Sequence, residues 1–497
     1  MSNRLSFALF LLAACGDNDG NLQPDAAAPD APPDAVQPFV APTPFSVPLA
    51  TTGPDQLMAA AAGPNNTFYA AGFAAQAVAG AKDVVVVRLK GGAGTGGGGG
   101  GGGGPGSLDT TFSGDGIAAT GVAFVGANDE IDMAVLPDGK ILVTAVVAAA
   151  TANAVDAGDR DIAIIKLDTT GALDTSFGGG DGIATFSLNT SILNTAVPPV
   201  AVGRDGIRSI VVAADGKIYV HAYQRATGVD GGGLPRQDTD FVVARILADG
   251  TALDTTWGQA SSGKFILDIA GSSATPRGIQ LVNGQILASG YASSTITGNT
   301  TQPVLYKVLA DGAAADTAFA GGLFHEEVLA MQTEVYNYAL HGTKLVTAGY
   351  GRNAGTTNDW VSMRFDVATG VRDTTFGGVT APVPGAVLFD PSGSMLGSNC
   401  RNAIAGPNGK TILIGSAGPG NMPAQDAVFA VLDSDGKLDT TFGSGIHKYK
   451  LGADGNDQFW AGVTSGNRVL IVGYKGGGTA QTDTTNDDSF GVILSME

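Results

Sequence analysis

Short apolar segments separated by Gly, Asp and Pro recur along most of the chain. Between residues 131 and 187 four such segments follow one another: Ile131–Leu136, Lys140–Val147, Ile162–Leu167 and Gly182–Ser187. They are rich in β-branched residues and bounded by turn-forming residues, which is typical of β-strands. Asp-Gly between the first two segments indicates a tight hairpin. The pattern therefore predicts an antiparallel unit of four strands.

This unit recurs along the chain, and three elements mark each copy. An apolar third strand occurs seven times, a hairpin of the Asp-Gly-Lys type precedes it, and a bend resembling Leu-Asp-Thr-Thr-Phe follows it. The bends begin at Leu108, Leu173, Leu253, Ala315, Arg372 and Leu438, with spacings of 65, 80, 62, 57 and 66 residues. Self-similarity at this period indicates one supersecondary unit per repeat. We therefore expect an all-β fold, a seven-bladed β-propeller of four-stranded antiparallel blades.

The two ends of the repeat array are compatible with a closed ring. The last unit stops at its third strand, Ser489–Leu494, and a strand-like segment, Thr43–Ala50, precedes the first unit. We expect this N-terminal strand to complete the last blade and close the ring, which hides the sheet edges. A linear solenoid is the alternative, but it requires capping repeats, and the sequence shows none.

The stretch DGKILV … DIAIIKLDTTGALDTSFGGGDGIAT, within residues 138–185, resembles the delta-60 repeat family, a bacterial tandem repeat expected to form propellers. The resemblance covers about residues 39–497 and recurs in every unit. The chain departs from the family pattern at His341–Thr347, at Ala315–Phe319 and in the glycine run Gly96–Gly104. The resemblance implies a propeller fold and an extracytoplasmic setting, and it assigns no catalytic residues.

The N-terminus has the layout of a secretory signal. Arg4 precedes a short apolar region, and Leu12-Ala13-Ala14-Cys15 resembles the bacterial lipobox. We expect residues 1–14 to be a lipoprotein signal peptide, Cys15 to carry the lipid, residues 15–38 to be a disordered Asp/Ala/Pro tether, and residues 39–497 to form the propeller. Gly16 after the cysteine favours the outer membrane by the same resemblance. An ordinary export signal with an incidental cysteine is the alternative.

The bends contain the most regular charged residue of the repeats, at Asp109, Asp174, Asp254, Asp316, Asp373 and Asp439. An Asp followed by hydroxyl residues favours a turn in which side chains bond the backbone, so we expect these residues to be structural and the aromatic residue that follows to pack in the core. Calcium is the alternative, although it needs several converging oxygen ligands. Phosphate is disfavoured because no helix N-terminus follows. We expect no metal site and no cofactor.

A basic residue of the third strand lies eight or nine residues before the bend carboxylate in several units. Examples are Lys166 before Asp174, Arg245 before Asp254 and Arg364 before Asp373. A charge on an otherwise apolar strand needs a partner. We therefore predict that these residues form ion pairs that fix the bend to its blade.

The formal net charge of −19 argues against nucleic-acid binding, which needs a basic face. No nucleophile elbow, metalloprotease or complete phosphate-loop motif occurs, so no catalytic residue is assigned. The loops between second and third strands vary widely in length, and so do those that lead into each first strand. In a propeller both sets share one face, which favours a ligand there, and tolerated insertions without a ligand are the alternative. We expect a monomeric binding or scaffolding module at the cell envelope, with an envelope or extracellular protein or a glycan as partner. The alternatives are a carbohydrate-active propeller enzyme, a hydrolase or lyase acting at the channel mouth, and a purely structural envelope component.

Overall fold

The computed structural model divides the chain between Phe39 and Val40, and the fold described below is that of the second unit, Val40–Glu497. It describes residues 39–496 except for 50–52, 78–79, 93–102, 127–129, 151–158, 190–204, 230–232, 234–235, 237, 270, 295–299, 354, 379–382, 394–396, 419–424, 453–455 and 477–487. The predicted signal peptide and tether lie outside the described residues.

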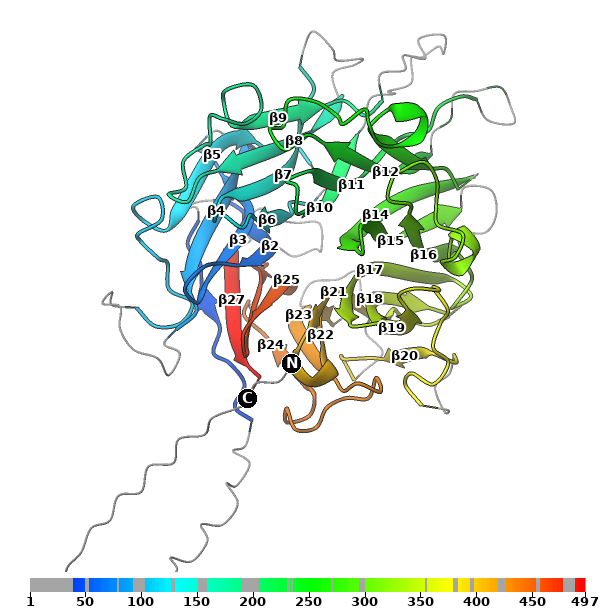
Figure 1. The fold of residues 1–497 in the computed structure, drawn as a ribbon. Coiled ribbons are helices and arrows are strands. Elements are labelled where there is room, and N and C mark those ends of the chain that lie inside the picture. Colours follow the sequence, from blue (N-terminus) through cyan, green and yellow to red (C-terminus); the bar gives the residue numbers. More distant parts are fainter. Residues whose placement is uncertain are drawn as a thin grey trace, which may run out of the picture. The chain divides into compact units, whose positions relative to one another are not determined.

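The first part of the unit forms three four-stranded sheets in which each strand is antiparallel to the next (Figure 1). They are β2 (Asp55–Ala62), β3 (Thr67–Ala75), β4 (Lys82–Lys90) and β5 (Ile117–Ala123); β6 (Met133–Val135), β7 (Ile141–Ala148), β8 (Arg160–Leu167) and β9 (Ile183–Phe186); and β10 (Gly206–Val212), β11 (Ile218–Arg225), β12 (Thr239–Ile246) and β13 (Lys264–Leu267). The second sheet contains the four strands predicted between residues 131 and 187, with each boundary within two residues of the prediction.

The remaining strands form one seven-stranded and two four-stranded sheets. They are β14 (Ser272–Val282), β15 (Gln285–Ser294), β16 (Thr301–Val308), β17 (Gln332–His341), β18 (Lys344–Arg352), β19 (Asp359–Asp366) and β20 (Ala386–Phe389); β21 (Ser398–Ala405), β22 (Thr411–Ala417), β23 (Asp426–Leu432) and β24 (Ile446–Tyr449); and β25 (Gln458–Ser465), β26 (Arg468–Lys475), β27 (Asp488–Ser495) and β1 (Phe45–Ser46). β1 pairs antiparallel with β27, as the N-terminal segment was predicted to do.

The prediction of four regular strands per unit is wrong for β14–β16. In the position of a fourth strand the chain makes a single bridge, Leu305 with Phe324. One parallel pair, Thr301 with Gln332, then joins β16 to β17 and merges two units into the seven-stranded sheet. The bend that begins at Ala315 is followed by the shortest spacing, 57 residues. Glu326 stands in the place of Phe186, Leu267 and Phe389 of other units. The sequence there is too short and too polar to continue the ladder.

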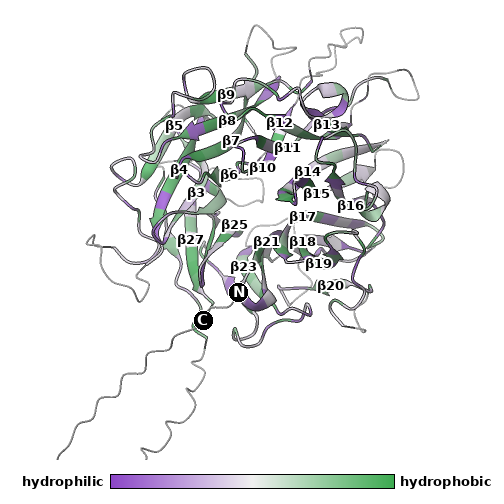
Figure 2. Ribbon diagram, in the orientation of Figure 1, coloured by the Kyte–Doolittle hydropathy of each residue, from purple (hydrophilic) through white to green (hydrophobic). Residues whose placement is uncertain are grey.

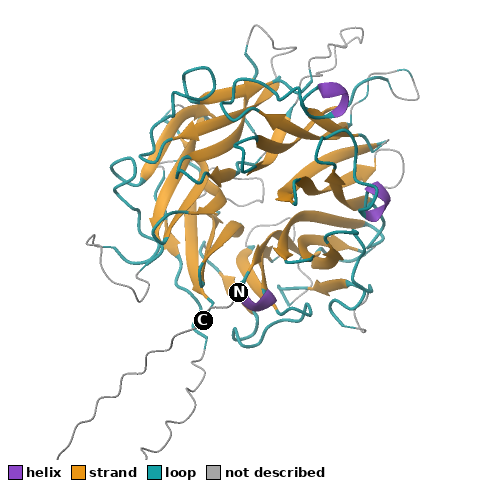
Figure 3. Ribbon diagram, in the orientation of Figure 1, coloured by secondary structure: helices purple, strands orange, loops and turns teal. Residues whose placement is uncertain are grey.

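Apolar side chains fill the spaces between successive sheets, and the strands are the most hydrophobic parts of the ribbon (Figure 2). One core, for example, joins β6–β9 to β10–β13 through Phe177, Ile207 and Val242, all fully buried. Among the described residues no α-helix occurs, and the helical segments are the short turns η1 (Gln259–Ser261), η2 (Ala320–Gly322) and η3 (Pro407–Gly409) (Figure 3). The all-β prediction is confirmed.

Each bend also contacts the next sheet along the chain. The Gly178 amide donates to the Asp249 carbonyl of the following unit at 2.9 Å, and the Phe177 ring covers Gly250, where an added Cβ would lie 2.4 Å from the ring. The same backbone bond recurs between Gly258 and Asp311 and between Gly377 and Asp435. The bends therefore bind neighbouring units together as well as turning the chain.

The first strand of each unit lies toward the common centre of the sheets (Figure 1). Six of these inner strands carry a register shift at the same place: β2, β10, β14, β17, β21 and β25. A bulge re-aims the side chain at that position. The bulges decide which residues face the centre, and there the candidate site lies.

Candidate functional site

The six bend carboxylates are already occupied by groups of the protein. In the second unit, Oδ1 of Asp174 accepts hydrogen bonds from the Ser176 amide at 3.1 Å and the Ser176 hydroxyl at 2.7 Å. Its Oδ2 accepts from Lys140 Nζ at 2.8 Å and lies 3.5 Å from Lys166 Nζ. The hydrogen bond from Lys140 is the main cause that holds the pKa of Asp174 well below its usual range. These contacts are those of a structural turn.

The predicted ion pairs of the third strand are present. Besides Lys166, Arg245 Nη2 lies 3.0 Å from Asp254 and Arg364 Nη2 lies 2.9 Å from Asp373. The prediction missed a second cation, the lysine of the Asp-Gly-Lys hairpin, which reaches the same carboxylate at Lys140, Lys217 and Lys410. The recurrent Gly-Lys in the hairpins was the available signal for this contact.

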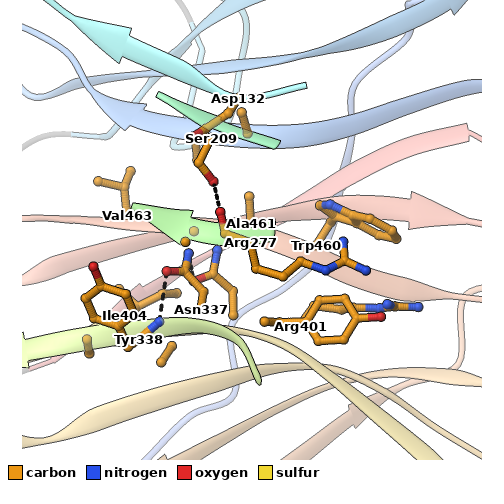
Figure 4. A pocket seen from close by; sticks show the side chains of 18 of the residues that line it. Asp132, Ser209, Arg277, Asn337, Tyr338, Arg401, Ile404, Trp460, Ala461 and Val463 are labelled. Atoms are coloured by element: carbon orange, nitrogen blue, oxygen red, sulfur yellow. Dashed lines mark hydrogen bonds between the residues drawn. The ribbon is translucent and has the colours of Figure 1, made fainter. Parts of the chain in front are cut away.

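A cavity of about 370 Å³ lies where the inner strands meet (Figure 4). Each inner strand, or the residues just before it, contributes to its lining. Six of the lining residues lie at the bulges and Asp132 lies just before β6, which gives the set Met58, Asp132, Arg208, Arg277, Tyr336, Arg401 and Trp460. Three of these seven are arginines, in a chain whose formal net charge is −19. The cavity therefore has the opposite electrostatic character to the chain as a whole.

Glu130 is the main partner of two of the arginines. Its carboxylate binds the Arg277 guanidinium and lies 3.5 Å from Arg208 Nη1, and both arginines are 7% exposed. Burial opposes ionisation of Glu130, but the charges of Arg277, Arg208 and Arg401 outweigh it and lower its pKa. Glu130 is therefore ionised at neutral pH.

Asp132 is the second carboxyl group in the cavity lining, and it holds two strands together. Its Oδ1 accepts the Met133 amide at 2.8 Å and its Oδ2 accepts the Ile210 amide of β10 at 3.0 Å. Burial raises the pKa of Asp132 to about 7, and the charge of Glu130 adds to the shift. Three guanidinium groups against one ionised carboxylate leave an excess of two positive charges in the lining when Asp132 is protonated.

Aromatic rings support the arginines. The Arg277 Cζ lies 3.8 Å from the centre of the Tyr336 ring, and the Arg401 Cζ lies 4.7 Å from Tyr336 and 4.9 Å from Trp460. Figure 4 shows Arg277, Arg401 and Trp460 on the same side of the cavity. Such contacts orient a guanidinium and contribute about 0.5–2 kcal/mol each. The cations are thus held in fixed positions.

A cluster of three carboxylates, Asp238, Asp240 and Asp268, lies away from this cavity, with ligand atoms within 4.8 Å of one another. Arg236 occupies the cluster: it donates from Nε to Asp238 at 2.9 Å and from Nη2 to Asp268 at 2.8 Å. The arginine supplies the positive charge that such a cluster requires. The cluster is therefore accounted for by its own ion pairs.

The structure locates the candidate site differently from the sequence-based prediction. We expected a ligand on the variable loops, but much of these loops, including residues 151–158, 419–424 and 477–487, lies outside the described residues, as does Cys15. The arginines of the cavity were not predicted. The available signal was a charged or aromatic residue in the middle of an apolar first strand, as at Arg208, Arg277 and Arg401.

Comparisons with known proteins concern the fold. A family model described as a domain of unknown function (DUF5122) beta-propeller matches residues 136–177. No functionally curated protein matches the chain. In the described residues no helix is both long enough and apolar enough to span a membrane.

Solved structures similar to this chain include the polysaccharide lyase Uly1 (10% identity, 88% of this chain and 90% of the other, TM-score 0.41). Others are an α-L-arabinofuranosidase of Fusarium graminearum (10%, 76% and 97%, 0.42) and the β-propeller domain of the trilobed protease from Pyrococcus furiosus (10%, 89% and 98%, 0.39). Identities this low transfer no activity to this chain. The antiparallel sheets and the family match together support a β-propeller fold for this chain.

Proposed function

We propose that the chain is a seven-bladed β-propeller of the delta-60 repeat type, closed by its N-terminal strand. Two observations support closure: β1 pairs with β27, and β2 of the first unit contacts β25 of the last. A hydrophobic core containing Val47, Leu57 and Leu470 lies between these units. Deletion of residues 39–50 tests this point, since it removes β1 and leaves the edge of β27 unpaired, and the protein is then expected to aggregate.

We further propose that the protein is a lipid-anchored binding or scaffolding module of the cell envelope, held in the outer membrane through Cys15. The lipobox-like sequence before Cys15 and the polar segment after it support the anchor. The anchor is tested by incorporation of labelled fatty acid, which Cys15→Ser should abolish. The bend carboxylates are proposed to need no calcium, so chelation should leave the melting temperature unchanged.

The cavity between the inner strands is the proposed ligand site, and the convergence of three arginines from three different units carries this proposal. Buried cations are costly in a purely structural core, whereas a ligand site makes use of them. The partner is proposed to be a glycan or an envelope protein that inserts a polar group into the cavity. The role needs no oligomer, so we propose a monomer.

The experiment uses residues 39–497 as bait against the cell's own envelope fraction, with cross-linking and identification of what is retained. A specific protein or polysaccharide supports the binding module. Retention of nothing by the wild-type bait would refute it, and a glycan-cleavage screen would follow.

An enzyme acting on carbohydrate is the other candidate, because arginines and carboxylates converge in one cavity. Its weakness is that both oxygens of Asp132 accept backbone amides and that Arg277 binds Glu130, so neither carboxyl is placed for proton transfer. Burial also raises the pKa of Tyr291, whose hydroxyl accepts from Arg277 at 3.1 Å. A cleavage activity that Asp132→Asn abolishes would reverse this preference.

A further inference from the structure

Arg401 is set apart from the other arginines of the cavity because it forms no ion pair, although the charge of Glu130 acts on it from a greater distance. Arg277 and Arg208 face Glu130. Among the described residues no carboxylate forms an ion pair with Arg401. The Nε atoms of all three arginines lack a hydrogen-bond acceptor, so the missing ion pair is what distinguishes Arg401. Its contacts are with the faces of Tyr336 and Trp460. Arg401 is partly buried. Aromatic faces compensate such a cation only in part, and they accept none of the five N–H donors in the guanidinium plane.

The residue type at the bulge that Arg401 occupies differs among the repeats, whereas the residue type at the bend is constant. Six bends carry Asp, which the fold requires there, whereas the six bulges carry four residue types: Met58, Arg208, Arg277, Tyr336, Arg401 and Trp460. Any of these residues can evidently be accommodated by the strand and its bulge. The particular set that faces the cavity is therefore not dictated by the repeat architecture.

We infer that Arg401 binds an oxyanion, the carboxylate, sulfate or phosphate group of a small polar ligand, within the central cavity. This inference rests on the proposal that the cavity receives a ligand. The planar guanidinium presents a fork of donors that matches an oxyanion in two parallel hydrogen bonds. Tyr336 and Trp460 lie against the guanidinium and fix its orientation before a ligand arrives. The excess positive charge of the lining attracts the anion.

The cavity volume of about 370 Å³ sets the size of the ligand group. It lies at the lower end of the range for small-molecule sites, about 300–1,000 Å³. One charged monosaccharide or the acidic side chain of a partner protein therefore fits, whereas a folded domain does not enter. Because Arg277 and Arg208 form ion pairs with Glu130 and Arg401 forms none among the described residues, the oxyanion is placed at Arg401.

The test is calorimetric titration of the full chain, at low ionic strength, with glucuronate, sulfate, inorganic phosphate and uncharged glucose. Arg401→Gln removes the charge and keeps a polar side chain of moderate length. Lys475→Gln is the matched control, because it also removes one positive charge but lies at an exposed pair with Asp488, 3.0 Å apart. We expect at least one of the three anions to bind, Arg401→Gln to weaken it at least tenfold, and Lys475→Gln to leave it within twofold.

Thermal melting separates a binding role from a structural one. Without anion, Arg401→Gln loses the contacts with Tyr336 and Trp460 but also removes a cation that has no ion pair, so its melting temperature is expected to stay close to that of the wild type. With anion, only the wild type and Lys475→Gln should gain melting temperature. Binding of glucuronate alone would identify an acidic sugar as the ligand, and equal binding of sulfate and phosphate would identify a general oxyanion site.

Three outcomes would overturn the inference: no binding of any anion, equal binding of glucose and glucuronate, or an equal gain of melting temperature with anion in the wild type and Arg401→Gln. Its failure is distinguishable from failure of the proposed function. If wild type and Arg401→Gln retain the same envelope partner equally, the binding module stands and the oxyanion site at Arg401 is wrong. If neither retains a partner while anions still bind at Arg401, the binding module is wrong and the oxyanion site stands.

Discussion

Replacement of Asp254 by Ala removes a buried carboxylate that holds one bend together. Asp254 is 2% exposed and accepts from the Thr256 amide at 3.1 Å and the Thr256 hydroxyl at 2.6 Å. It also forms ion pairs with Lys217 Nζ at 2.9 Å and Arg245 Nη2 at 3.0 Å. Breaking a buried ion pair costs about 3–5 kcal/mol, but the Arg245 side chain is 15% exposed and water recovers part of this. We expect a loss of about 3 kcal/mol in the free energy of unfolding.

Asp249→Ala is the matched control. Asp249 begins a similar turn, exposed to solvent, and accepts only from the Thr251 amide at 3.1 Å and the Thr251 hydroxyl at 2.8 Å, without an ion pair among the described residues. The backbone bond from its carbonyl to Gly178 survives the substitution. Two exposed hydrogen bonds to a turn residue contribute about 0.5–1 kcal/mol in total.

Thermal unfolding followed by circular dichroism measures the difference. An unfolding entropy of about 2 cal/mol/K per residue gives about 1 kcal/mol/K for the unit Val40–Glu497. Asp254→Ala should therefore lower the melting temperature by about 3 °C and Asp249→Ala by about 1 °C or less. Adding Arg245→Ala to Asp254→Ala should cost less than the two single losses combined, because the residues share one interaction. Equal effects of the two aspartate variants would refute the reasoning that the ion pairs stabilise the bend.

Three further predictions concern pH and packing. Burial raises the pKa of Asp205 to about 7, whereas the unfolded chain loses this proton near pH 4. The free energy of unfolding should therefore fall as the pH rises from about 5 to about 7. Melting temperatures measured across this range should change less with pH for Asp205→Asn than for the wild type. Arg364→Ala removes two contacts with Asp373 Oδ2, from Nη2 at 2.9 Å and from Nε at 3.0 Å. It should lower the free energy of unfolding, measured with urea, by at least about 1 kcal/mol. A loss below about 0.5 kcal/mol would contradict the pairing argument. Gly250 and Gly284 both have positive φ, but only Gly250 lies against an aromatic ring. Gly250→Ala should therefore lower the free energy of unfolding by about 1–3 kcal/mol more than Gly284→Ala. Similar losses in the two variants would show that backbone strain alone matters.

The sequence by itself determined the repeating framework. Strand positions between residues 131 and 187 followed from alternating apolar segments and turn residues, because both signals are local. The ion pair of Arg364 with Asp373 could be predicted as well, since the residues are nine apart and a charge on an apolar strand needs a partner. The burial of the bend aromatic, as at Phe177, followed from the same repeated pattern.

Tertiary structure alone decided the cavity. Glu130 and Arg277 form a pair although 147 residues separate them, and no local pattern predicts which repeats face each other at the centre. The bulges that turn Arg208 and Arg401 inward change the face to which a side chain points, so strict strand alternation fails there. The local framework is encoded in each repeat, whereas the charge of the centre arises because inner strands distant in the sequence converge on one space.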